Sequence, residues 1–397
     1  MIDFPNPRFR TYGSYHHYFV VLKRILFGRW TRGNEIECLE NRVSKIVGAT
    51  HAIALPKARV AIFLAVKALI RPGQEVILSP YTISDVVNMV ICAGGIPVFV
   101  DIDPVTLNMC PEDLEKLITD NTGAILVTHL HGLSADMKHI LAKSKDRNIP
   151  VVEDAAQSFG TRLHGDHIGS LGDIGVYSFG QFKNINSFFG GMMVTSNDQI
   201  AKIIRPEIAA FPFQERDYFL SKMFSNIVTD IVTWPPLFKF FTFWIFRTAM
   251  IKDIAWLNRK VIVDESPTSK TVLPETYLRR MTPTQAELIL DQIDNVSQYC
   301  QQRIDTAKKY HDGLSGLSTV RLPPLRLDSS HTYSYYPVAV ENRPEVIKMM
   351  MEKYCDIAAQ HLKNCADLEC FSKYFRDCPN ARKIASDLIL LPTYPRY

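Results

Sequence analysis

The sequence predicts an α/β protein in which a seven-stranded, mainly parallel sheet is followed by a smaller C-terminal α+β domain. Over the first two-thirds of the chain, short apolar runs alternate with helical patterns. Most of these runs are rich in β-branched residues and bounded by Gly, Pro or Asp, as expected of strands covered on both faces. At 397 residues the chain exceeds one ordinary core, so more than one domain is expected.

The elements of the first domain follow in order along the chain. Strands are expected at 52–55, 75–80, 96–102, 124–129, 150–155, 175–179 and 191–195. Helices are expected between them at 58–70, 111–118 and 136–145. In a parallel sheet of this kind, ligands bind at the carboxyl ends of the strands.

The C-terminal part begins with a strong helix start at Thr282-Pro283-Thr284-Gln285. It supplies an N-cap, a proline at the first helical position and a capping-box Gln, so one helix is expected from there towards Leu314. A strand within 332–340 and a helix at 344–353 are expected next. We therefore expect a large domain at 1–204, an aromatic-rich connecting segment at 205–274 and a smaller domain at 275–397.

Composition excludes several classes of protein. With 47% hydrophobic and 22% charged residues, the chain is neither disordered nor collagen-like. The net charge of 45 − 41 = +4 is too small to indicate a nucleic-acid partner. The eight cysteines contain no CxxC pair and indicate neither a disulfide framework nor a metal site. Because the N-terminus lacks an apolar run of signal-peptide length, a reduced, cytoplasmic protein is expected.

Residues 218–257 are rich in aromatic side chains, with seven of them between Trp234 and Phe246. Charged residues and Pro235-Pro236 interrupt this stretch, so no membrane-spanning helix is expected. Two interpretations remain: a segment buried in the core or against another subunit, and a segment in peripheral contact with a membrane, on its inner face.

The densest group of polar residues follows the strands at 150–155 and 175–179. Asp154 and Gln157 lie at or just past the first strand end, and Ser178 and Lys183 lie at or beyond the second. A lone Asp or Lys there is usually a helix cap or a solvated charge. Together they suit pyridoxal phosphate (PLP), because a lysine amine forms a Schiff base with its aldehyde and a carboxylate keeps its pyridine nitrogen protonated.

In these residues, and in further segments along the chain, the sequence resembles the DegT/DnrJ/EryC1/StrS family of sugar aminotransferases. The resemblance is carried, in the family's order, by PGQEVILSPYT (72–82), GGIPVFVDIDPVTLNM (94–109), HLHGLSADM (129–137), EDAAQSFG (153–160), GDIGVYSF (172–179), Lys183-Asn184-Ile185 with Gly190-Gly191, RRMTPTQAELILDQID (279–294) and LPTYP (391–395). It runs along nearly the whole chain and implies the fold of type I PLP enzymes, and a homodimer.

The resemblance also implies roles for individual residues. Lys183 is the implied Schiff-base lysine and proton carrier, and Asp154 the implied partner of the pyridinium nitrogen. Gln157 is placed beside the cofactor ring, and Ser178 on the phosphate.

Three departures surround the implied phosphate site. Where the family has Ser-Gly-Thr, this chain has Lys57-Ala58-Arg59. Ala58 still lies at a helix N-terminus, and Arg59 is expected either to bind the phosphate or to be a surface residue. The aromatic that stacks on the ring is replaced by Ile83, so stacking is left to Ile83 or Tyr81. Leu278-Arg279-Arg280-Met281 lacks the Asn with which the partner subunit contacts the phosphate.

The leading hypothesis for function is therefore a PLP-dependent aminotransferase. It moves an amino group, from glutamate, to a keto-sugar nucleotide in the biosynthesis of a surface polysaccharide or a secondary-metabolite sugar. A second hypothesis keeps PLP but takes a lipid-linked or acyl substrate, because the aromatic segment is long for the family. A third is a catalytically weak binding or scaffold relative, because the phosphate site has changed. The sequence leaves open whether Lys57-Ala58-Arg59 binds PLP tightly.

Overall fold

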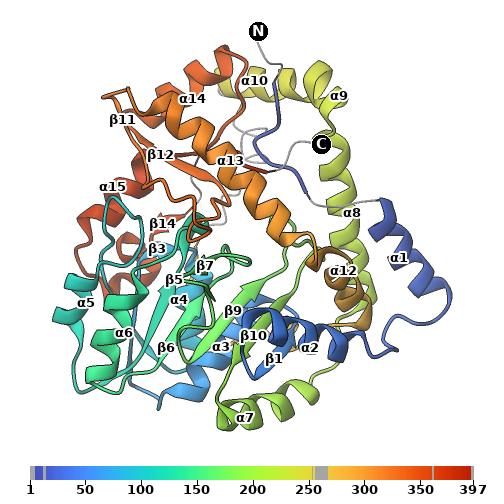
Figure 1. The fold of residues 1–397 in the computed structure, drawn as a ribbon, viewed down its shortest axis with the longest axis vertical. Helices are drawn as coiled ribbons and strands as arrows, with labels where there is room; N and C mark the ends of the chain where they lie inside the picture. The colour runs from blue at the N-terminus through green and yellow to red at the C-terminus, as the bar shows by residue number, and fades with distance from the viewer. Residues whose placement is uncertain (1–4, 12–14, 253, 255–266, 360–361, 395–397) are drawn as a thin grey trace.

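The computed structural model describes residues 5–11, 15–252, 254, 267–359 and 362–394. Its centre is a seven-stranded sheet in the order β1-β10-β9-β6-β5-β2-β4 (Figure 1). All seven expected strands are present, and β10 runs antiparallel to both of its neighbours while the other neighbouring pairs are parallel. The strands are β1 (His51–Leu55), β2 (Glu75–Leu78), β4 (Ile96–Phe99), β5 (Thr122–Thr128), β6 (Val151–Asp154), β9 (Ile174–Ser178) and β10 (Gly191–Thr195).

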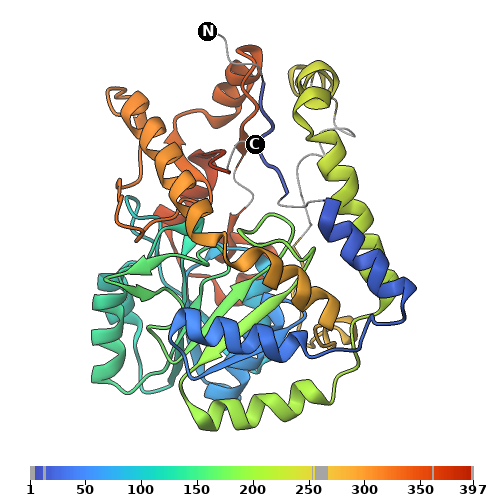
Figure 2. The ribbon, with the colours of Figure 1, turned by 45° about the vertical axis from the view of Figure 1, so that its right-hand side comes forward.

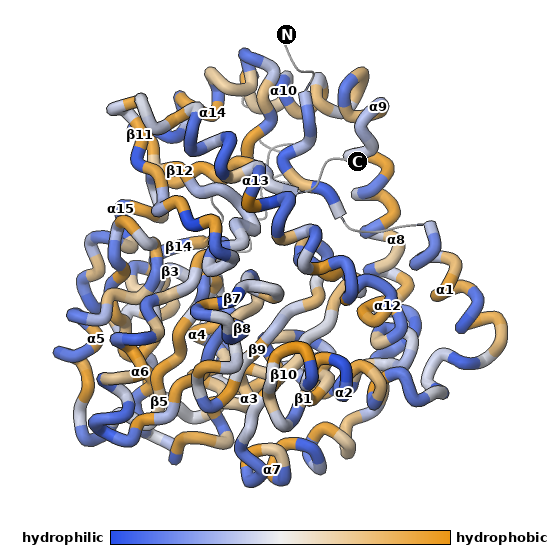
Figure 3. Tube along the Cα trace, viewed as in Figure 1, coloured by the Kyte–Doolittle hydropathy of each residue, from blue (hydrophilic) through white to orange (hydrophobic). Residues whose placement is uncertain are grey.

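Helices cover both faces of this sheet, and alternate strand residues face opposite helices. In β5, Ala124 and Leu126 belong to the same core cluster as α3 and α7, whereas Ile125 and Val127 belong to the cluster of α2 and α12. The central strands are accordingly hydrophobic on both faces, and Figure 3 colours much of β5 and β6 as hydrophobic. The first face is covered by α3 (Ala58–Leu69), α4 (Ser84–Cys92) and α7 (Asp198–Ala209); the second by α2 (Glu35–Val47), α5 (Pro111–Leu117), α6 (Met137–Asp146) and α12 (Pro283–Ile293).

A four-stranded antiparallel sheet, β11-β12-β15-β13, forms the centre of the C-terminal part. Its strands and helices are β11 (Val320–Arg321), β12 (Tyr336–Val340), β13 (Ala358–Ala359), β15 (Leu388–Leu391), α13 (Val296–Leu314), α14 (Arg343–Glu352) and α15 (Pro379–Asp387). The N-terminal segment also packs here, since Arg8 forms a salt bridge with Asp356. The expected domain boundary after residue 204 falls within α7.

Short elements connect these parts. Two-residue strands pair as β3 (Tyr81–Thr82) with β14 (Lys363–Asn364) and as β7 (Arg162–Leu163) with β8 (Asp166–His167), and the short helices are η1 (Leu130–Gly132), η3 (Glu275–Tyr277), η4 (Cys365–Asp367) and η5 (Glu369–Tyr374).

The expectation of one helix from 283 to Leu314 was wrong, because α12 ends at Ile293 and α13 begins at Val296. The expected capping box is present: the Thr282 hydroxyl accepts from the Gln285 N–H, and the Gln285 side chain accepts from the Thr282 N–H. The helix is interrupted where the Gln292 side chain donates to the Leu288 carbonyl and the Asn295 N–H turns back to the Gln292 carbonyl. Asp294 and Asn295, which lie at this break, are poor helix formers.

The aromatic segment forms helices that are partly buried and partly exposed. They are α8 (Arg216–Val232), α9 (Pro235–Leu237), the π-helix η2 (Phe238–Thr242) and α10 (Phe243–Ile251). Phe238 and Phe243 are buried, whereas Phe240 and Phe241 are exposed, so the segment matches neither sequence interpretation throughout. Residues 253 and 255–266 of this segment lie outside the described residues. No helix in the described part of the chain is long and apolar enough to span a membrane.

The N-terminal helix α1 (Tyr15–Leu26) lies beside α8, as Figure 2 shows. Tyr18 of α1 donates to Asp230 of α8, and the Asn226 amide donates to the Tyr18 hydroxyl at 2.6 Å. Neither α1 nor α8 was among the helices expected from the sequence.

Candidate functional site

Lys183 lies in the loop that joins β9 to β10. The loop closes on itself, because the Lys183 N–H donates to the Gly180 carbonyl at 3.0 Å. Helix α12 holds it from outside: Gln285 Nε2 donates to the Phe189 carbonyl, and Gln292 Nε2 to the Asn186 carbonyl, each at 2.9 Å. Two buried glutamines on a neighbouring helix therefore hold the loop that carries the lysine.

Asp154 ends β6, the strand next to β9, and is buried. Its Oδ1 accepts from the Ala156 N–H at 3.1 Å. Burial raises the pKa of the Asp154 carboxyl, and the Lys183 charge opposes that rise. Desolvation lowers the pKa of the Lys183 amine, and Asp154 opposes that fall. The two groups are thus coupled, and the amine is closer to its neutral, nucleophilic form than an exposed lysine would be.

Gln157 and Tyr81, two of the expected cofactor-binding residues, both contact His131. The Gln157 Oε1 accepts from the His131 N–H at 2.9 Å, in a backbone turn where His131 has φ 57°. The rings of Tyr81 and His131 lie 6.2 Å apart. Tyr81 is buried, whereas Ile83, the N-cap of α4, is 38% exposed. Of the two residues expected to stack on a ring, Tyr81 is therefore the one in the interior.

Ser178 and the N-terminus of α3 meet at a glycine. Ser178 ends β9 opposite Gly191, the first residue of β10. A Cβ on Gly191 would lie 2.6 Å from the Ala58 nitrogen, so only glycine lets the start of α3 approach the sheet. The first N–H groups of a helix have no partner within the helix and suit an anion. Ser178 and Ala58 are thus arranged to fit a phosphate group.

Arg59, in the first turn of α3, has its side chain engaged with other residues. It forms an ion pair with Asp85 of α4 and donates to the Tyr277 hydroxyl at 3.0 Å. Lys270 binds the other oxygen of the same carboxylate at 2.5 Å. Arg59 is therefore not a plain surface residue, and sequence reasoning missed Asp85, Lys270 and Tyr277 because they are far from it in the chain.

Sequence reasoning also missed a buried polar network beside Asp154. Glu153 accepts from the N–H groups of Gly169, Leu171 and Gly172 at 2.9, 2.7 and 2.6 Å. His129 Nε2 lies 3.1 Å from the same carboxylate, and His129 Nδ1 accepts from the Ala135 N–H. The signal in the sequence was a carboxylate within the apolar run PVVEDA.

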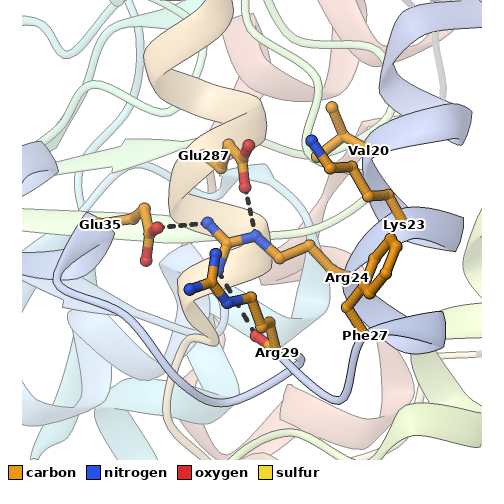
Figure 4. Close-up of a pocket in the computed structure, with 7 residues that line it drawn as sticks. All are labelled: Val20, Lys23, Arg24, Phe27, Arg29, Glu35 and Glu287. Atoms are coloured by element: carbon orange, nitrogen blue, oxygen red, sulfur yellow. Dashed lines mark hydrogen bonds and ion pairs between the residues drawn. The ribbon is translucent and has the colours of Figure 1, made fainter.

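A separate cavity of about 590 Å³ lies between α1, α2 and α12 (Figure 4). It is lined by Val20, Lys23, Arg24, Phe27, Arg29, Glu35 and Glu287. Arg24 bridges Glu35 and Glu287 within it. None of the predicted site residues lines this cavity, so it is distinct from the site around Lys183.

Comparisons with known proteins bear on the whole chain. The model of the DegT/DnrJ/EryC1/StrS aminotransferase family matches residues 20–225 and 256–397. The spore coat polysaccharide biosynthesis protein SpsC of Bacillus subtilis is 29% identical over 93% of this chain and 87% of that protein. GDP-perosamine synthase of Escherichia coli O157:H7 is 38% identical, over 42% of this chain and 46% of that protein.

Solved structures share the fold. The E. coli GDP-4-keto-6-deoxy-D-mannose-3-dehydratase with bound hydrated PLP has a TM-score of 0.76 at 18% identity, over 98% of this chain and 95% of that chain. PseC of Helicobacter pylori, an aminotransferase involved in the biosynthesis of pseudoaminic acid, has a TM-score of 0.76 at 17% identity, over 98% and 94%.

Proposed function

Because this chain belongs to the DegT/DnrJ/EryC1/StrS aminotransferase family, we propose that it uses PLP to move an amino group from glutamate to a keto-sugar nucleotide. The observation that carries the proposal is the electrostatic coupling of Lys183, in the loop after β9, with Asp154, at the end of the neighbouring strand β6. The relatives named above act in polysaccharide or nucleotide-sugar chemistry, which supports this substrate class. A role in the biosynthesis of a surface polysaccharide or a secondary-metabolite sugar follows from it.

Each site residue has a task in this proposal. When bound, PLP supplies a ring that accepts the electrons released at the substrate carbon. Lys183 would hold the cofactor through its amine, and the same amine would carry a proton to and from that carbon. Asp154 keeps the ring nitrogen protonated, because a buried carboxylate stabilises a positive charge beside it.

The remaining residues position the cofactor. Ser178 and the N–H groups at Ala58 and Arg59 would bind its phosphate, and Tyr81 and Gln157 would hold its ring. Gln157 suits this task because its side chain is already held by the His131 N–H. The lowered pKa of Lys183 favours the neutral amine that attachment needs.

An absorption spectrum tests the proposal. The protein with PLP is expected to show a visible band, which glutamate shifts and Lys183→Ala abolishes. Lys202→Ala, an exposed lysine of α7 in the same domain, serves as the control. Amine transfer by Lys183→Ala at the wild-type rate would contradict the proposal. A wild-type protein without a band at saturating PLP would favour the scaffold hypothesis instead.

We further propose a homodimer in which a second copy covers the exposed apolar faces of α1 and α8. These faces consist of Tyr15, Phe19, Leu22 and Leu26 of α1 and Phe224, Val228 and Ile231 of α8, each at helical spacing. The two helices lie side by side (Figure 2). An exposed apolar face on a surface helix often marks an interface.

Peripheral membrane contact, with a lipid-linked substrate, is the alternative, and it concerns the exposed side chains of η2 and α10. Phe240, Phe241 and Trp244 are exposed, and Lys239 and Arg247 lie among them. Light scattering and liposome flotation separate the two proposals. Phe224→Glu is expected to give monomers, whereas Phe375→Glu, a similarly exposed residue (60% against 66%) elsewhere in the chain, is expected to leave the dimer intact. A wild-type monomer that floats with anionic liposomes would favour membrane contact.

A further inference from the structure

The loop that carries Lys183 is also held by helix α8, on both sides of the lysine. Before the lysine, Gln181 Nε2 donates to the Thr229 hydroxyl at 3.0 Å. After the lysine, Asn186 Nδ2 donates to the Asn226 Oδ1 at 2.9 Å. The bonds from α12 described above all fall after the lysine. Helix α8 therefore fixes the two ends of the short stretch in which Lys183 lies.

Asn186 is a fully paired residue in this loop. It is buried, its N–H donates to Gln292 Oε1 at 3.0 Å, and its carbonyl accepts from Gln292 Nε2. Its side-chain Oδ1 accepts from the Phe188 N–H at 2.8 Å, in a turn where Phe188 has φ 67°. Because that oxygen is engaged by the turn, the amide of Asn186 presents its NH₂ group to Asn226.

Asn226 is oriented from its other end by two groups. It is fully buried, and its Nδ2 lies 2.6 Å from the Tyr18 hydroxyl oxygen and 3.3 Å from Asp230 Oδ2. The Tyr18 hydroxyl itself donates to Asp230. An ionised carboxylate only accepts hydrogen bonds, so the NH₂ group of Asn226 faces this pair and its carbonyl faces Asn186. The direction of the bond between the two amides is thus fixed at both ends.

This part of α8 has two different faces. Asn226 and Thr229 bond to the lysine loop, whereas Phe224, Val228 and Ile231 are exposed on the other side of the helix. Polar residues towards the interior and apolar residues towards solvent reverse the usual pattern of a surface helix. Burial of apolar area does not explain the inward polar residues, and their hydrogen bonds to the loop do.

We propose that Asn226 and Thr229 of α8 are positioning residues for Lys183. They act through the loop that they hold, and they keep the lysine amine within the electrostatic reach of Asp154. Neither of them is assigned a contact with cofactor or substrate. The use of the amine to attach PLP rests on the proposed function, whereas the positioning rests on the hydrogen bonds between α8 and the loop.

The pKa of the Lys183 amine reports its position. Desolvation lowers this pKa, and the Asp154 carboxylate opposes that fall. A loop released from α8 lets water reach the amine, so the pKa is expected to rise towards the ordinary lysine value of 10.5. A loss of overall stability in a protein that is still folded does not by itself move this pKa.

Labelling with acetic anhydride at a series of pH values, on the full-length protein free of cofactor, tests the proposal. Peptide mass spectrometry gives a labelling midpoint for each lysine, and that of wild-type Lys183 is expected below that of the exposed Lys202. Asn226→Ala is expected to raise the Lys183 midpoint by about half a pH unit or more, which leaves about 3-fold less neutral amine at neutral pH. Thr229→Val, which removes only a hydroxyl, is expected to raise it less. Ser225→Ala, exposed on the same helix, is the control.

A double-mutant cycle shows whether Asn226 acts through Asn186. On an Asn186→Ala background, Asn226→Ala is expected to shift the Lys183 midpoint no further, because the bond between the two side chains is already absent. Additive shifts would overturn the proposal. Midpoints in Asn226→Ala and Thr229→Val equal to that in Ser225→Ala would also overturn it, and Thr229→Val alone decides if Asn226→Ala does not fold. Because the labelling uses no cofactor, a wild-type protein that fails to bind PLP refutes the proposed function and leaves this result intact.

Discussion

Replacing Glu153 by glutamine removes a buried charge while keeping the shape of the side chain. The carboxylate accepts four hydrogen bonds: Oε2 from Gly169 and His129, and Oε1 from Leu171 and Gly172. Its side chain and that of His129 are both fully buried. His129 donates through Nε2, since its Nδ1 accepts from the Ala135 N–H.

The cost follows from the number of donors left without an acceptor. Whichever way the glutamine amide turns, its NH₂ group faces two of these four donors. Each buried donor without a partner costs about 1–3 kcal/mol, so the variant is expected to lose roughly 2–6 kcal/mol of unfolding free energy. Because native proteins have only about 5–15 kcal/mol, this loss is large.

Urea unfolding followed by circular dichroism measures the effect. Glu115→Gln is the matched control, since Glu115 is 60% exposed in a salt bridge with Lys143. A surface change of that kind is expected to stay within about 0.5 kcal/mol of wild type. If Glu153→Gln unfolded with the same free energy as Glu115→Gln, the assignment of Glu153 as the anchor of residues 169–172 would be refuted.

Three further predictions concern the site and its surroundings. Gly191→Ala places a Cβ 2.6 Å from the Ala58 nitrogen. It is therefore expected to weaken PLP binding about 10-fold, as measured by absorbance titration, and to lower the free energy of unfolding by about 1–3 kcal/mol. Gly313→Ala, which has open space around it, is the control and is expected to change neither quantity. Asp154→Asn is expected to keep the visible band with PLP but to slow its response to glutamate about 100-fold in stopped flow, and an unchanged rate would remove Asp154 from the proposed chemistry. His167 is buried and its pKa is lowered to about 4, by desolvation first and then by Arg162. In the unfolded chain His167 takes up a proton as the pH falls below its ordinary pKa of 6.5, whereas in the folded chain it does so only near pH 4. The free energy of unfolding is therefore expected to fall as the pH drops from 6.5 to 4, by about 2 kcal/mol at pH 5. Urea unfolding at neutral pH and at pH 5 is expected to show a loss of unfolding free energy that is about 2 kcal/mol larger in the wild type than in His167→Gln. Equal losses in the two proteins would contradict the prediction.

Much of the fold was predictable because strands and caps leave local signals. The run AILVTH predicts a buried strand, and β5 is buried at every position from Thr122 to Thr128. Thr282 and Gln285 form the expected capping box. The end of the same helix was not predictable, because its break depends on Gln292, whose side chain bonds to the distant Asn186.

In the aromatic segment, local patterns did not predict which side chains are buried and which are exposed. Phe238 and Phe243 are buried while Phe240 and Phe241 are exposed, although all four have the same chemistry. The difference arises from the helical phase, with the buried rings on the side that faces the C-terminal core. Hydrophobicity alone does not reveal which face of a helix finds a neighbour.

The sequence by itself determined the class of the fold and the family, and it put Asp154 and Ser178 at strand ends and Lys183 just beyond the second of them. It does so because strand alternation, turn residues and motif order are all local properties of the chain. Only the tertiary structure decided that Arg59 pairs with Asp85 and that the Lys57 amine lies over the rings of Tyr218 and Tyr277. Those partners lie between about 26 and 220 residues apart, and ion pairs over such separations depend on how helices and loops pack, which no local pattern records.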